Sequence, residues 1–309
     1  MNNQRLGLLV FSLACISSGR VFADEGHFGY DGSLGPKFWP KNFQTCAGKY
    51  QSPIDIEEHL VTRVSYPPIR YHGFADKPVG STLTNNGHTV MLQLNTEEPL
   101  AVSGGPLKDR YLFQQLHFHW GHNDSVGSED TINNHSFPME LHMVFFNQKY
   151  HNFTNALNHE DGLTVMAFFY EVSAEDNFVY AEIVEHLPTV VLPHSEAKLS
   201  RQLPLELLLP NDKSQYYTYH GSLTTPPCSE VVTWIDFKES ILLSHEQVEE
   251  FRSLQDTDGD TMTHNNRPVQ PLGNRVVYFN EREDYSSAVC SKSALILISA
   301  LFIALLATN

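Results

Sequence analysis

The sequence predicts a mostly β protein of the α+β class. We expect a single domain around a large, mostly antiparallel twisted sheet, with a few short helices at its periphery. Short segments rich in β-branched and aromatic residues recur along the chain, clusters of Gly, Pro, Asn and Asp separate them, and helical patterns are few. Between residues 24 and 285 there is no low-complexity linker, repeat or abrupt change of composition, so one domain is the simpler interpretation.

Five segments have the clearest strand pattern, and they are, in chain order, residues 89–95, 111–120, 139–147, 163–172 and 230–237. The clearest helix is predicted over residues 244–254, where Ser244 and Gln247 are spaced as a capping box before an apolar-periodic run. The acidic motif DTDGD at residues 256–260 lacks the glycine position and the closing glutamate of an EF-hand. It is interpreted as an exposed loop.

The amino-terminal segment, residues 1–23, is predicted to be a secretory signal peptide. Arg5 precedes an apolar run, and Val21 and Ala23 are spaced as small residues before a cleavage site. The mature domain would then comprise residues 24–285.

The carboxy-terminal segment, residues 286–309, favours a GPI-anchor signal that is removed on attachment at Ser286 or Ser287. Small residues are followed by a short polar spacer and an apolar tail. The tail is shorter than the ~20 residues of a usual membrane-spanning helix. A short hydrophobic membrane anchor, or a secreted form, remains the alternative to a lipid-anchored protein on the extracellular face of the plasma membrane.

Cysteines and glycosylation motifs agree with secretion. Cys15 and Cys290 fall in the terminal segments, which leaves Cys46 and Cys228, most simply as one disulfide. Three Asn-x-Ser/Thr motifs predict surface glycan acceptors at Asn123, Asn134 and Asn152.

The charge balance excludes some partners. The formal net charge is −16, whereas binding to nucleic acid or anionic lipid needs clustered Lys and Arg. A secreted acidic protein that associates with mineral or matrix is a further hypothesis, but no acidic repeat supports it. Protein partners are not indicated.

Two predicted strands carry histidines at alternating positions. In residues 111–120, Gln115, His117 and His119 share one face of an extended chain, and the opposite face carries Leu116, Phe118 and Trp120. His122 lies beyond the strand and is not expected to be a ligand.

The strand at 139–147 repeats this arrangement. Glu140, His142 and Val144 share one face, and the opposite face carries Leu141, Met143 and Phe145. If the two strands pair, three imidazoles converge, and three neutral histidines with one open position are typical of a catalytic zinc site. Gln115 and Glu140 could orient the ligands by accepting their other ring N–H. Half-buried polar residues on an ordinary sheet remain the alternative.

Eight ordered blocks of sequence resemble the α-class carbonic anhydrases across nearly the whole mature chain. They are QSPIDI (51–56), NNGH (85–88), LHFHWG (116–121), GSED (127–130), MELHMV (139–144), DGLTV (161–165), YHGSLTTPPCSEVVTW (219–234) and NRPVQPL (266–272). The resemblance implies an enzyme that interconverts CO₂ and bicarbonate.

The resemblance also implies one Zn²⁺ per chain, held by His117, His119 and His142, with Gln115 and Glu140 orienting these ligands. The metal lowers the pKa of a bound water to about 7, the value established for this enzyme class, and the resulting hydroxide attacks CO₂.

Further residues take roles from the same resemblance. Thr224 accepts the hydrogen bond of the hydroxide and donates its own to Glu129, and Thr225 contacts bicarbonate. From residues alone Thr224 is a turn residue before two prolines. An apolar wall for CO₂ is implied at Val144, Val165, Leu223, Val232 and Trp234, where plain core packing is the alternative.

The resemblance implies that His88 carries the product proton outward, with Tyr30 and Asn86 ordering the connecting water. An imidazole with an ordinary pKa near about 6.5 suits this transfer. Cys46 and Cys228 match the disulfide of secreted members.

The chain departs from the family at Asp130, where histidine is usual, and at His220, where proline is usual. Since the family includes catalytically silent relatives, a binding or adhesion module is the competing hypothesis. Those relatives typically lack a ligand histidine, and this chain has all three.

Overall fold

The computed structural model of the chain describes residues 27–281. The predicted signal peptide, Ser286, Ser287 and the apolar tail lie outside these described residues. Within residues 27–281, no helix is both long enough and apolar enough to cross a bilayer.

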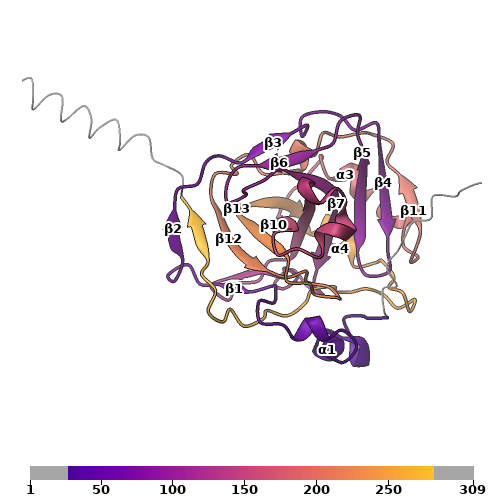
Figure 1. Cartoon of the computed structure of the whole chain (residues 1–309). Coiled ribbons are helices and arrows are strands. Elements are labelled where there is room, and N and C mark those ends of the chain that lie inside the picture. Colours follow the sequence, from indigo (N-terminus) through magenta and orange to yellow (C-terminus); the bar gives the residue numbers. More distant parts are fainter. Residues whose placement is uncertain (1–26, 282–309) are drawn as a thin grey trace, which may run out of the picture.

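A 12-stranded sheet forms the framework (Figure 1), in the order β11-β4-β5-β7-β9-β10-β13-β12-β14-β2, with β3 paired to β6 and β6 to β7. Its strands are β2 (Thr62–Val64), β3 (Arg70–His72), β4 (Gly80–Asn85), β5 (Val90–Asn95), β6 (Ala101–Ser103), β7 (Tyr111–Trp120), β9 (Met139–Asn147), β10 (Leu163–Ser173), β11 (Glu196–Lys198), β12 (Tyr216–Gly221), β13 (Val232–Ser244) and β14 (Tyr278–Asn280). A separate parallel pair joins β1 (Asp55–Ile56) to β8 (Thr131–Ile132).

The helices among the described residues are short and peripheral. They are α1 (Trp39–Asn42), α2 (Phe153–Ala156), α3 (Ala181–Val184) and α4 (His245–Phe251). Single 3-10 turns occupy Gly32–Leu34, Pro36–Phe38, Gln44–Ala47, Gln148–Tyr150, Leu187–Thr189 and Leu205–Leu208. Figure 1 shows α1 below the sheet, apart from the other labelled helices.

The predicted fold class is confirmed. In the large sheet only β10 with β13 and β14 with β2 run parallel, and the other strand pairs are antiparallel. The predicted strands 111–120 and 139–147 coincide with β7 and β9. The capping box of Ser244 and Gln247 is present, although α4 ends at Phe251.

The strand predicted over 230–237 differs most from the structure. β13 begins at Val232 and continues to Ser244. Its polar residues at 238–240 hide the continuation from a pattern search, but pairing resumes beyond an irregularity between Phe168 and Tyr170 of β10. Tertiary pairing therefore overrides the local pattern here.

The two faces of the sheet carry different kinds of side chain. One face of β7 and β9 packs into the larger apolar cluster through Leu116, Phe118, Trp120, Leu141 and Met143. The other face carries the histidines and a second apolar cluster. Because each large apolar side chain contributes roughly 1.5–3 kcal/mol when buried, the larger cluster holds the strands in register.

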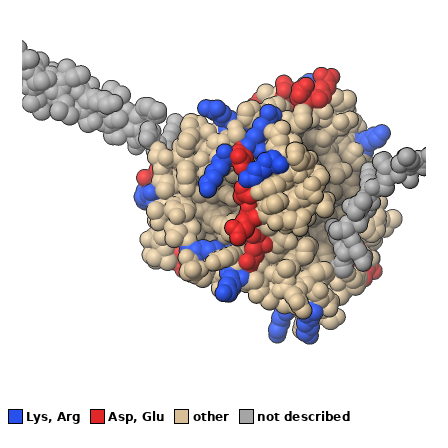
Figure 2. Space-filling view, viewed as in Figure 1, with Lys and Arg blue, Asp and Glu red and all other residues tan. Residues whose placement is uncertain are grey.

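The surface reflects the acidic composition. Figure 2 shows acidic side chains in a band across one face, and Lys and Arg gather beside part of that band. The basic side chains of this face do not merge into one continuous surface. The arrangement agrees with a net charge of −16.

Asp236 interrupts the second apolar cluster. It lies on β13 between Tyr217 and Ala167 of the neighbouring strands and is fully buried. Neither carboxyl oxygen has a hydrogen-bond partner. Burial raises its pKa well above the usual value, and the nearby Asp130 raises it further.

Replacing Asp236 with Val should stabilise the protein at neutral pH by about 2 kcal/mol, since an unsatisfied buried carboxyl group is removed. The folded-state pKa is raised, so the contribution of Asp236 to stability is fully present below the unfolded pKa of about 3.9 and is lost as pH rises through the folded pKa. The gain from Asp236→Val should therefore grow with pH. Urea unfolding at pH 5 and pH 8, with exposed Asp76→Val as the control, measures this. A gain that is equal at both pH values would contradict the expectation.

Candidate active site

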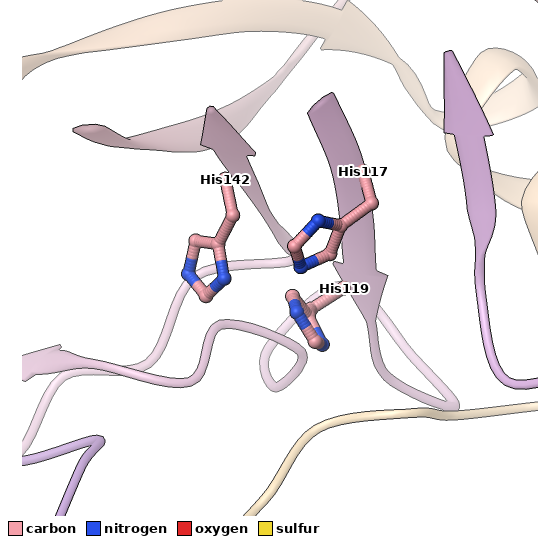
Figure 3. Close-up of side chains that lie close together, drawn as sticks. All are labelled: His117, His119 and His142. Atoms are coloured by element: carbon pink, nitrogen blue, oxygen red, sulfur yellow. The ribbon is translucent and has the colours of Figure 1, made fainter. Parts of the chain in front are cut away.

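Three histidines meet on one face of paired strands (Figure 3). The antiparallel register of β7 and β9 places His117 directly opposite His142, and His119 opposite Glu140. The ring centroids of the histidines are 5.0, 5.3 and 4.6 Å apart. One potential ligand nitrogen from each ring lies within 4.8 Å of the others. The predicted convergence of the three imidazoles is confirmed.

Each ring has one nitrogen occupied by an acceptor. His117 Nδ1 lies 2.9 Å from the amide oxygen of Gln115, and His119 Nδ1 lies 2.8 Å from the Asn265 carbonyl oxygen. His142 Nε2 lies 2.7 Å from Glu140 Oε1. The amide oxygen and the backbone carbonyl oxygen only accept, and so does Glu140 in its ionised form, so each of the three nitrogens is then the donor. The lone pairs are then left on Nε2 of His117, Nε2 of His119 and Nδ1 of His142.

Burial keeps the rings neutral. It lowers the pKa of His119 to about 4 and those of His117 and His142 well below the usual value, to which the neighbouring histidines add. A neutral imidazole has the lone pair that a metal ion requires, so no proton has to leave before metal binding at neutral pH.

Two buried polar atoms beside the rings lack a hydrogen bond, and the nitrogen of the pair fits a metal ligand. His119 Nε2 and Glu129 Oε2 have no hydrogen-bond partner. They are 3.4 Å apart, and His142 Nδ1 lies 3.8 Å from the same oxygen. Among the described residues, only His117, His119 and His142 form a group of three or more His, Cys, Asp or Glu side chains able to hold a metal.

Glu140 is fixed from both sides. Besides His142, its carboxylate accepts the backbone N–H groups of Glu129 at 2.7 Å and Asp130 at 3.0 Å. Burial and the neighbouring acidic groups, Asp130 first, raise its pKa well above the usual value. The position of His142 thus depends on the chain at residues 129 and 130.

Asp130, one of the departures from the family, is itself an acceptor. Its Oδ1 receives the N–H of Ile54 at 2.7 Å and the hydroxyl of Tyr219 at 3.0 Å. Burial raises its pKa to about 7. His220, the other departure, is half-buried with its ring 6.3 Å from that of Tyr50.

Glu129 lies between two segments that are distant in sequence. Its Oε1 accepts the backbone N–H of Arg267 at 2.7 Å. Burial raises its pKa to about 8, and hydrogen bonds from Arg267 and the Thr224 side chain act in the opposite direction. Thr224 is buried, and Thr225 beside it is partly exposed.

The loop that carries Thr224 is tied to the amino-terminal segment. Cys46 and Cys228 form a disulfide, as expected. Gln51 Nε2 donates to the Cys228 carbonyl at 3.1 Å, which adds a second connection. This loop therefore does not rely on its own turn for its position.

An apolar wall adjoins the histidines. The ring of Trp234 lies 4.9 Å from that of His142. Val144 pairs in register with Val165, which pairs with Trp234. These residues share one apolar cluster with Val232 and the partly buried Leu223.

His88 lies farther out, stacked on Phe28 with ring centroids 3.9 Å apart. We expected an ordinary pKa, but burial lowers the pKa of His88 to about 4. The Asn86 side chain accepts the backbone N–H groups of His88 and Thr89, both at 2.9 Å. The hydroxyl of Tyr30 is buried without a hydrogen-bond partner.

The remaining predicted positions lie at the surface. Asn123, Asn134 and Asn152 are exposed. His122 is exposed and is not in the histidine cluster. Within DTDGD, residues 258–260 are exposed, and no metal-binding group is found there among the described residues.

Two residues of the site were missed by the pattern search. Asn265 is fully buried, and its side chain binds the Trp120 N–H at 2.7 Å and the carbonyls of Phe118 and His88 at 3.0 and 3.1 Å. Arg267 donates to the carbonyls of Ser52 and Cys46 at 2.7 and 3.3 Å. Both lie in irregular chain, where no periodicity marks a buried residue.

A mostly β domain that gathers three neutral imidazoles, with its described cysteines joined in a disulfide, has the features of a catalytic rather than a structural zinc protein. The family profile of eukaryotic-type carbonic anhydrase matches residues 34–281. Carbonic anhydrase 7 of Mus musculus is 41% identical over 261 residues, covering 82% of this chain and 97% of that protein. Carbonic anhydrase 6 of Homo sapiens is 36% identical over 258 residues, covering 81% and 82%. The chain belongs to the eukaryotic-type, α-class carbonic anhydrases, which are zinc enzymes.

Replacing Gln115 with Ala should weaken zinc binding roughly 10- to 100-fold, because the ring of His117 loses the acceptor that fixes its tautomer. Competition with a chelator measures the dissociation constant. The matched control is Gln114→Ala, which removes the same side chain at the exposed neighbouring position. Equal zinc affinity in the two variants would show that Gln115 does not orient the ligand.

Proposed function

We propose that this carbonic anhydrase hydrates CO₂ reversibly with one zinc ion held by Nε2 of His117, Nε2 of His119 and Nδ1 of His142, at the extracellular face of the cell. The observation that carries the proposal is the set of three ring hydrogen bonds, which leaves one lone pair on each imidazole. When bound, zinc acidifies a water molecule to a pKa of about 7, as established for this enzyme class, and favours ionised carboxyl groups nearby.

Glu129 and Thr224 would orient the nucleophile. A threonine hydroxyl has one hydrogen, so donation to Glu129 leaves only acceptor capacity on its oxygen. That oxygen would select a nucleophile that donates a hydrogen bond and would turn its free lone pair toward CO₂, which is a positioning effect. Thr225, next along the chain, would contact bicarbonate.

CO₂ would bind on the apolar side of the site. It has no charge and no hydrogen-bond donor, so an apolar wall holds it without competing for the polar groups that orient the nucleophile. The wall consists of Val144, Val165, Leu223, Val232 and Trp234, which belong to one cluster beside His142.

His88 would carry the product proton toward solvent, with Tyr30 and Asn86 beside its path. Its stacking on Phe28 holds the imidazole in one place. Burial favours the neutral, proton-accepting form at neutral pH. The low pKa also means that His88 would hold the proton only briefly.

The location of the enzyme is part of the proposal. Residues 1–23 would be a signal peptide, residues 24–285 the domain, and residues 286–309 a removed GPI signal with attachment at Ser286 or Ser287. The exposed positions of Asn123, Asn134 and Asn152 leave room for glycans.

If the protein is GPI-anchored, phosphatidylinositol-specific phospholipase C should release it from cells. Retention after treatment, with a known GPI-linked protein released in parallel, would favour a hydrophobic membrane anchor.

The competing binding-module hypothesis requires a chain that neither holds zinc nor hydrates CO₂. Residues 24–285 should bind about one zinc per chain and hydrate CO₂ in a stopped-flow assay, with inhibition by a sulfonamide. A variant with His142→Ala serves as the control without a complete ligand set. Less than about half a zinc per chain, together with no sulfonamide-sensitive activity, would rule out the proposed enzyme mechanism.

Replacing His88 with Ala should lower kcat by about tenfold or more in dilute buffer and leave kcat/KM nearly unchanged, since proton export follows the chemical step. Added imidazole should restore turnover. His159→Ala, an exposed histidine stacked on Tyr150, is the matched control. Unchanged turnover in His88→Ala would remove His88 from the mechanism.

A further inference from the structure

A small cavity on the outer side of the site is shared by two histidines. Its volume is about 20 Å³, and His88 and His264 both line it, together with Asp31, Asp256 and Asp258. A space needs roughly 10–15 Å³ of this volume to hold one water molecule, and the water needs two or more polar partners. The cavity meets both conditions and fits about one water.

The ring of His88 packs against this cavity and is only partly exposed. Phe28, which is buried, stacks on its ring with an interplanar angle of 13°. Its backbone N–H is bound by Asn86, and its carbonyl accepts from the side chain of Asn265 at 3.1 Å. The cavity therefore offers a proton on His88 a second exit, besides the partly exposed edge of its own ring.

His264 has the position for that transfer. It directly precedes Asn265, which is hydrogen-bonded to the His88 backbone. Its side chain is 26% exposed, so one imidazole borders both the cavity and solvent. Its Nε2 lies 3.7 Å from a carboxylate oxygen of Asp31, whose side chain is 85% exposed. The two side chains are close enough to form an ion pair while the imidazole carries a proton.

We propose that His264 is the outer proton-relay residue of this enzyme. The protonated ring of His88 gives its proton to a water in the cavity, that water gives a proton to the unprotonated ring nitrogen of His264, and His264 releases it to buffer. His88 returns to its neutral form, and no other bond changes. The inference rests on the proposed function of His88 and extends it.

Several other charged or titratable groups surround the two imidazoles. Asp256 and Asp258 favour a charge on His88, and His27 and His194 oppose it. His27 is itself close to Asp258, at 3.4 Å, and the ring of His122 lies 6.4 Å from that of His264. The groups that face the relay are therefore Asp31, Asp256, Asp258, His27, His122 and His194.

His122 is the matched control for His264, because it is an exposed histidine nearby that does not line the cavity.

The test compares His264→Gln, His122→Gln, His88→Ala and the double variant His88→Ala/His264→Gln, all loaded with zinc. In dilute buffer, His264→Gln should lower kcat about three- to tenfold with kcat/KM unchanged, and imidazole should restore it. His122→Gln should match the unmodified protein. The double variant should be no slower than His88→Ala, because the two residues act in series.

A second readout does not depend on turnover. In imidazole NMR titrations, His264→Gln should raise the midpoint of His88 by ~0.3 pH units, because a neighbouring positive charge is lost. Asp31→Asn should give a smaller fall in kcat than His264→Gln and keeps the proposal testable if His264→Gln fails to fold.

The outcomes separate this proposal from the one it rests on. If kcat is unchanged in His264→Gln while His88→Ala is slow, the outer relay is overturned and His88 keeps its role. If His264→Gln cannot be made, the same conclusion follows from an unchanged kcat in Asp31→Asn. Unchanged kcat in His88→Ala overturns both. A fall in kcat/KM or zinc content in His264→Gln shows a structural effect on the site and also overturns the relay.

Discussion

The pairing of β7 with β9 is the constraint on which the rest of the site depends. Since side chains alternate along a strand, a slip of one residue would turn the histidines into the larger apolar cluster and bring leucine and phenylalanine to the metal position. The register is fixed on the opposite face, where Leu116, Phe118, Leu141 and Met143 are fully buried. Apolar packing on one face thus sets the geometry of the ligands on the other.

Each ligand of this strand pair is then fixed by a different kind of partner. His117 relies on a side chain of its own strand, His142 on its own strand neighbour Glu140, and His119 on the backbone of Asn265. Only the partner of His119, the backbone of Asn265, lies on a segment far along the chain. The site therefore forms in full only when the irregular chain around residues 265–267 has closed over β7, which couples ligand orientation to tertiary folding.

Some residues of the fold and site can be predicted from the sequence and others cannot, and the difference has a physical reason in each case. Alternation alone placed Gln115, His117 and His119 on one face, because a strand has a fixed period of two. The pairing of β7 with β9, the disulfide and the fold class were confirmed, and the ordered sequence blocks supported them better than any local pattern. Asn265 was missed because irregular chain has no period. The low pKa of His88 was missed because burial under Phe28 is a tertiary property.

The acidic groups beside the ligands show what the departure at Asp130 changes. Its carboxyl group accepts from Ile54 and Tyr219, so the position still joins three segments, although it brings negative charge close to Glu140. Burying carboxyl groups together raises the free energy of their ionised forms. A divalent cation among the histidines offsets that cost, whereas the metal-free protein must keep some of these groups protonated. Metal binding and fold stability are therefore linked in this chain through its buried acids as well as through its ligands.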